Sequence, residues 1–146
     1  MRSLSNFSFA LSLSLALLPS FATHAAAAEK IASLEVSIDD AALVKQDAGI
    51  RTLFVIVYDA DSPRPMPYGA LKVDLKADAK GTFYTGDLTS ENIQTMGGGA
   101  VPKNLRLKAR LDKDGSAGMD AAGDLVGSAE KIKAGDKVKI KISKAI

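Results

Sequence analysis

The chain has 146 residues, a formal net charge of +2, a single histidine and no cysteine. This length suits one domain with a modest hydrophobic core, and the lack of cysteine excludes disulfide bonds and thiolate metal ligands. The nearly balanced charge gives no reason to expect binding to nucleic acid.

The first 28 residues have the pattern of an export signal. Arg2 precedes an apolar run over residues 7–18, and small residues follow this run up to Ala28. The run is shorter than the roughly 20 apolar residues that a membrane-spanning helix needs. We expect residues 1–28 to be a signal peptide, cleaved after Ala28 or one of the alanines just before it. Residues 29–146 would then form a soluble periplasmic domain without stable insertion in the membrane.

The first two predicted strands differ in which of their faces are apolar. Leu34, Val36 and Ile38 alternate with polar residues, which predicts a strand with one buried face. Residues 53–58 are apolar on both faces, so we place this strand in the middle of the core. Three prolines within residues 63–67 lack backbone donors and restrict φ, which predicts that the strand ends in a stiff turn.

The middle of the chain alternates short strands with loops. We interpret residues 71–75 and 82–85 as strands, and the polar segment 76–81 as the hairpin loop that joins them. Ser90 is placed to cap a single helical turn before Met96. The glycine triplet that follows indicates a loop or, alternatively, the flexible lip of a binding groove.

Two later strands have one apolar and one basic face. Residues 105–111 and 138–142 both alternate apolar residues with lysine or arginine, and a less regular strand is expected over 125–132 between them. The lysines near the C-terminus are expected to protect a sheet edge, with a docking face for an acidic partner as the alternative. In total, about six or seven short strands without a helical period predict an all-β fold. We expect a single antiparallel β-sandwich of immunoglobulin-like type.

The sequence offers few catalytic groups. The only histidine, His24, lies in the expected signal peptide, so residues 29–146 contain neither histidine nor cysteine. This excludes Ser-His-Asp and Cys-His catalysis, ordinary zinc sites and blue-copper ligation. Asp59 and Asp61 are a remaining pair of acids. We expect them to bond backbone donors of the turn rather than to catalyse hydrolysis, and we expect the protein not to be an enzyme.

Two sets of residues have partial features of a metal site. The segment 112–123 begins like a calcium-binding loop but lacks the glycine and the final acidic ligand that such a loop requires, so its Asp-Gly pair predicts a hairpin turn. Met66, Met96 and Met119 could bind cuprous ion if they converged. We interpret them instead as apolar contact residues, because thioethers make adaptable surfaces, and we expect no cofactor.

Five short segments occur in an order and spacing that match a known domain. They are TLFV at 52–55, RPMP at 64–67, ARL at 109–111, KDGSA at 113–117 and GDLVG at 123–127. Together with the closing strand they resemble the periplasmic C-terminal domain of the cytochrome c maturation factor CcmI, also called CycH. The similarity covers nearly all of residues 29–146.

The resemblance implies a non-catalytic binding or chaperone module in c-type cytochrome biogenesis, with apocytochrome c or other maturation proteins as partners. We expect Met66, Tyr68, Phe83 and Met96 to contact the partner, because they are apolar and lie in or beside predicted turns. The alternative is a periplasmic protein that handles cuprous copper through Met66, Met96 and Met119.

Overall fold

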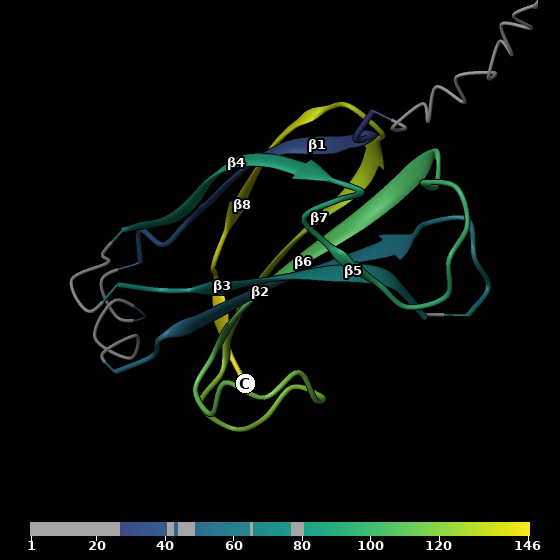
Figure 1. Cartoon of the computed structure of the whole chain (residues 1–146). Helices are drawn as coiled ribbons and strands as arrows, with labels where there is room; N and C mark the ends of the chain where they lie inside the picture. Colours follow the sequence, from purple (N-terminus) through teal and green to yellow (C-terminus); the bar gives the residue numbers. More distant parts are fainter. Residues whose placement is uncertain (1–26, 41–42, 44–48, 65, 77–80) are drawn as a thin grey trace, which may run out of the picture.

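The computed structural model describes residues 27–40, 43, 49–64, 66–76 and 81–146 (Figure 1). The expected signal peptide lies outside these residues except for its last two. Within the described ranges the chain forms nine strands, seven of which are five residues or longer, which confirms the expected all-β fold. The strands are β1 Lys30–Ser37, β2 Thr52–Asp59, β3 Pro67–Asp74, β4 Thr82–Thr89, β5 Gln94–Thr95, β6 Asn104–Asp112, β7 Leu125–Lys133, β8 Lys137–Lys141 and β9 Lys144–Ala145.

The strands form a sandwich of two sheets. The smaller sheet has the order β4-β1-β8 and the larger sheet has the order β5-β3-β2-β6-β7-β9 (Figure 1). Neighbouring strands are antiparallel except β1 and β8, which pair in parallel. This exception to the expected antiparallel arrangement is possible because β1 and β8 are far apart in the chain, so no tight hairpin constrains their direction.

Strand β2 lies in the middle of the larger sheet, between β3 and β6, as its two apolar faces predicted. Leu53, Val55 and Val57 face the core and have no exposed surface. The alternate residues point to the outer face of this sheet, the face turned away from the smaller sheet. Phe54 is one of them, yet only 4% of it is exposed. The outer face is therefore itself covered at this end of β2.

The hydrophobic core fills the space between the sheets. Burial of these aliphatic side chains supplies the main favourable free energy of folding. The fully buried members with the largest side chains are Ile31, Val36, Leu53, Val55, Leu88, Leu105, Leu107, Leu111, Leu125, Ile140 and Ile142.

Strand β8 lies at one end of the smaller sheet and presents its lysines to solvent, as expected for a protected edge. Lys139 forms an ion pair with Glu35 of β1 at 3.0 Å, and Lys141 forms one with Asp39. Because the neighbouring strand supplies these acids, the lysine row is partly neutralised within the domain. A separate acidic partner is not needed to explain it.

The predicted hairpin over residues 76–81 is wrong. Strands β3 and β4 belong to different sheets, so the segment between them crosses from the larger sheet to the smaller one. Residues 77–80 lie outside the described part of the chain. A polar connection that ends in glycine suits either a hairpin or a crossover, and the alternation of β3 and β4 does not identify their partners.

The predicted helical turn after Ser90 is also replaced by a different structure. The Ser90 hydroxyl accepts a hydrogen bond from the Glu29 backbone N–H at 3.0 Å, so it does not cap a helix. The Asn92 side chain accepts from the Thr89 N–H at 2.9 Å and closes a tight turn. The chain then enters β5, which pairs with Gly69 and Ala70 of β3.

The C-terminal segment passes from the smaller sheet to the larger one beside Gly127. Strand β8 belongs to the first sheet and β9 to the second, and the Ser143 N–H donates to the Val126 carbonyl at 3.0 Å between them. A Cβ atom at Gly127 would lie 2.1 Å from the carbonyl oxygen of Lys141. Only glycine therefore permits this close approach of two backbones.

We expect Gly127→Ala to lower the free energy of unfolding by about 1–3 kcal/mol or more, because its methyl group meets backbone that cannot rotate away. Gly97→Ala is the matched control, since nothing lies within 4 Å of a Cβ atom at that position. The control should stay within about 0.5 kcal/mol of the wild type in urea unfolding. Equal stability of the two variants would contradict the close approach.

Candidate functional site

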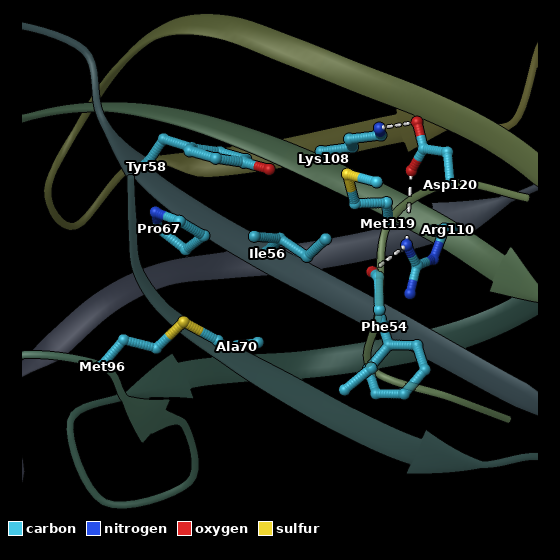
Figure 2. A pocket seen from close by; sticks show the side chains of 12 residues that line it. Phe54, Ile56, Tyr58, Pro67, Ala70, Met96, Lys108, Arg110, Met119 and Asp120 are labelled. Atoms are coloured by element: carbon cyan, nitrogen blue, oxygen red, sulfur yellow. Dashed lines mark hydrogen bonds and ion pairs between the residues drawn. The ribbon is translucent and has the colours of Figure 1, made fainter. Parts of the chain in front are cut away.

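The outer face of the larger sheet carries a groove of about 560 Å³ (Figure 2). Phe54 and Ile56 of β2 and Ala70 of β3 form an apolar floor. Met96, just after β5, stands on one side, and Met119, from the loop between β6 and β7, stands on the other. These two methionines are 56% and 93% exposed. We call this feature the outer-face groove.

The groove continues toward the β5 edge of the sheet. An adjoining hollow of about 340 Å³ shares Phe54, Ala70, Met96 and Ala117 with it. The two spaces together form one depression with an apolar floor that runs across β2 and β3. Their volumes fall in or near the range of about 300–1,000 Å³ that is usual for binding sites.

One wall of the groove is the β6–β7 loop, residues 113–124, which folds over the outer face because of Arg110. The Arg110 guanidinium donates to the carbonyl oxygens of Gly118 at 2.8 Å and of Ser116 at 3.0 Å. Arg110 is only 1% exposed. The alternation of β6 predicted a solvent-exposed basic face here. The prediction is wrong at Arg110, because the loop that follows β6 turns back and encloses this side chain.

Three carboxylates surround the same guanidinium. Arg110 Nη2 lies 3.0 Å from Asp112 Oδ2, Nη1 lies 3.3 Å from Asp120 Oδ1, and Nε lies 3.8 Å from Asp124 Oδ2. The guanidinium carbon also lies 5.2 Å from the centre of the Phe54 ring, so the cation rests on the groove floor. Among the described residues, Arg110 Nε has no hydrogen-bond partner.

Two of these carboxylates also hold the loop backbone. Asp112 Oδ1 accepts from the N–H groups of Gly115 at 2.6 Å and of Ser116 at 3.1 Å. The Asp124 carboxylate accepts two further loop N–H groups, at 3.1 and 2.8 Å. The predicted hairpin turn at Asp114 is wrong: the chain bends there, with φ of 74° at Gly115, and starts a long loop that ends before β7. The carboxylates of Asp112 and Asp124 therefore hold the loop backbone at its two ends.

The acids around Arg110 differ in their electrostatics. Burial raises the pKa of Asp112, a hydrogen bond with Asp114 raises it further, and Arg110 opposes both effects. The hydrogen bond from Lys108 holds the pKa of Asp120 below its ordinary value, and Arg110 contributes in the same direction. Asp120 thus joins two cations of β6 and anchors the loop segment that carries Met119 (Figure 2).

The predicted contact residues are divided between different parts of the molecule. Met96 lines the groove, whereas Met66 lies in the turn before β3, is 66% exposed and does not line it. Tyr68 and Phe83 are half-buried and pack against the core. Met119 joins Met96, so two of the three methionines considered as copper ligands line one groove.

The groove floor itself was not among the sequence candidates. The signal that could have revealed it is the apolar outer face of β2, since the sequence shows Phe54, Ile56 and Tyr58 on one side of a strand whose other side already fills the core. A strand that is apolar on both faces needs other parts of the molecule to shield each face from water. The smaller sheet covers one of them, and the groove with its loop lies over the other.

The paired acids of the proline-rich turn have structural contacts. Asp59 Oδ1 accepts the Asp61 N–H at 2.9 Å, which confirms the expected backbone bond. Asp61 Oδ2 accepts from the Asn104 side-chain amide at 2.8 Å and ties the turn to the start of β6. Within the described part of the chain, no group of three or more His, Cys, Asp and Glu side chains is arranged to hold a metal ion.

Comparisons with known proteins identify no relative: no family model matches the chain, and neither a curated protein nor a solved structure matches it. Across the described residues, no helix has the length and apolar character that crossing a membrane requires.

We expect Arg110→Met to lower the free energy of unfolding by about 3–5 kcal/mol, because it leaves buried carboxylates without their cation. In urea unfolding the deficit should narrow as the pH falls, since protonation removes the uncompensated charges. Lys108→Met is the control, and it should cost at most about 1 kcal/mol because that ion pair is partly exposed. A loss as small in Arg110→Met as in the control would contradict the role assigned to the buried guanidinium.

Asp120→Asn should be destabilising at neutral pH and not in acid. The folded-state pKa of Asp120 lies below its unfolded value, so its stabilising effect is complete above the unfolded pKa and is lost as the pH falls through the folded one. In urea unfolding, the difference in free energy of unfolding between the variant and the wild type should therefore shrink below about pH 4. Asp74→Asn, at an exposed position, should show no such gap at any pH. A stability difference between Asp120→Asn and the wild type that widened in acid would contradict a lowered pKa of Asp120 in the folded state.

Proposed function

We propose that this protein is a non-catalytic binding module that holds an extended apolar polypeptide segment in the outer-face groove. The observation that supports this most directly is the pairing of an apolar floor with two exposed methionines, Met96 and Met119, on opposite sides of it. Unbranched thioethers adapt to varied apolar side chains, which suits a site for unfolded chains of differing sequence. An unpaired apolar groove of this kind is typical of an interaction site.

The resemblance to the CcmI/CycH domain directs the proposal toward c-type cytochrome biogenesis. Three of the segments that carry it, 109–111, 113–117 and 123–127, contain Arg110, much of the β6–β7 loop and Asp124, which together build one wall of the groove. We therefore propose apocytochrome c, or another maturation protein in the periplasm, as the source of the bound segment.

The test is isothermal titration calorimetry with overlapping blocked segments of an apocytochrome c. The double variant Met96→Ser with Met119→Ser should bind at least about tenfold more weakly, because both contacts at the sides of the groove lose their apolar surface. Met66→Ser, outside the groove, should bind like the wild type. Loss of binding in Met66→Ser alone would place the site in the turn instead, and no binding to any segment would refute the proposed function.

A cuprous-copper role is the second candidate, because Met96 and Met119 line the same groove. Met96→Leu with Met119→Leu distinguishes the two roles, since leucine keeps the apolar contact and removes the sulfur ligand. Under the binding proposal this variant keeps most of its affinity for the segments. Under the copper proposal, a cuprous-ion titration should show that the double leucine variant has lost the copper affinity of the wild type. Equal copper affinity in both proteins would eliminate copper handling.

A further inference from the structure

Three cations of β6 lie in a row beside the groove floor. In the register of β2 and β6, Arg106 is opposite Tyr58, Lys108 is opposite Ile56 and Arg110 is opposite Phe54. Side chains that are directly opposite on one face of an antiparallel pair lie close enough to interact. The outer face thus pairs three apolar residues of β2 with three basic residues of β6.

Within the described part of the chain, two of these cations pair with carboxylates and the third does not. Lys108 pairs with Asp120, and Arg110 pairs with three carboxylates, as described above. Arg106 forms no ion pair or hydrogen bond through its side chain with any described residue, and its contact is the ring of Tyr58, 4.3 Å from the guanidinium carbon. Stacking on a ring leaves the N–H donors of an arginine free to bind a carboxylate in bidentate geometry.

Arg106 lies where the groove meets a second hollow. Tyr58, on whose ring it stacks, lines the end of the groove. Arg106 itself lines a hollow of about 220 Å³ that shares Lys108 with the groove. Glu130 is the acid among the residues that line this hollow, and no ion pair joins it to Arg106. A segment lying in the groove can therefore continue past this guanidinium.

The backbone opposite Arg106 is irregular. The pairing of β6 with β7 shifts register between Leu105 and Leu107, and Lys131 in this bulge has φ of 57°. A left-handed conformation is unfavourable for a residue with a side chain, and such outliers and bulges concentrate at functional sites. This observation is independent of the charges and marks the same position.

We propose that Arg106, held on Tyr58, binds an acidic side chain of the segment in the groove. The preferred partner is then an extended apolar segment that carries one Asp or Glu at the Tyr58 end of the groove. This inference rests on the proposed function and narrows its ligand class. Charge complementarity supports it, because Lys108 and Arg110 pair with carboxylates of the domain, whereas Arg106 has no ionic partner among the described residues.

The test uses overlapping segments of an apocytochrome c, blocked at both ends, each made with its acidic residues kept or changed to the corresponding amides. The wild type should bind the best acidic segment about three- to tenfold more tightly than its amide form. Arg106→Gln should bind both forms alike, and Arg106→Glu should prefer the amide form. Lys137→Gln, which removes the same charge from the smaller sheet, is the matched control and should keep the wild-type preference.

The outcomes separate this inference from the proposed function. If segments bind in a way that depends on Met96 and Met119, but acidic and amide forms bind equally, the role of Arg106 is refuted while the groove remains. If an amide form left unblocked at its C-terminus binds as tightly as the acidic form, a terminal carboxylate suffices and the ligand class is wrong. If no segment binds, both proposals fail. Thermal unfolding of each variant verifies that the fold is intact.

Discussion

The buried guanidinium of Arg110 is the interaction on which the shape of the outer face depends. Removing a cation from water carries a penalty of several kcal/mol, and here three carboxylates and two backbone carbonyls offset it. Those partners come from the end of β6 and from the β6–β7 loop. The loop must therefore lie on the sheet rather than extend into solvent, and it places Met119 opposite Met96. One ionic cluster thus forms a wall of an apolar groove.

The three basic residues of β6 differ in how far carboxylates of the domain neutralise their charges. Arg110 is enclosed and structural, and Asp120 pairs with both Arg110 and Lys108. The Arg106 guanidinium lies over the Tyr58 ring and has no ion pair with any residue that the structure describes. Along β6 the basic face thus changes from a buried arginine near its end to a half-buried arginine near its start.

Period-two alternation predicted much of the fold. The buried faces of β1, β2, β6 and β8 follow directly from the apolar residues at every second position. The same rule failed at Arg110, since alternation describes which way a side chain points but not whether a later loop covers it. The crossover at 76–81 was missed for a related reason: a strand pattern does not identify its partner strand.

The candidate site was only partly predictable. Met96 was named from its neighbourhood in the sequence, but the floor at Phe54 and Ile56 and the wall at Met119 depend on contacts between distant strands. Tyr68 and Phe83 are apolar for a different reason, because they pack against the core. Local sequence shows which residues are apolar, whereas the topology determines which of them share a surface.

Binding in the outer-face groove can be observed by NMR of the protein labelled at its methionine methyl groups and titrated with a binding segment of apocytochrome c. The signals of Met96 and Met119 should shift or broaden on addition of the segment, because both line the groove, and the signal of Met66 should not change. A change at Met66 alone, or at none of the three methionines, would contradict binding in the outer-face groove.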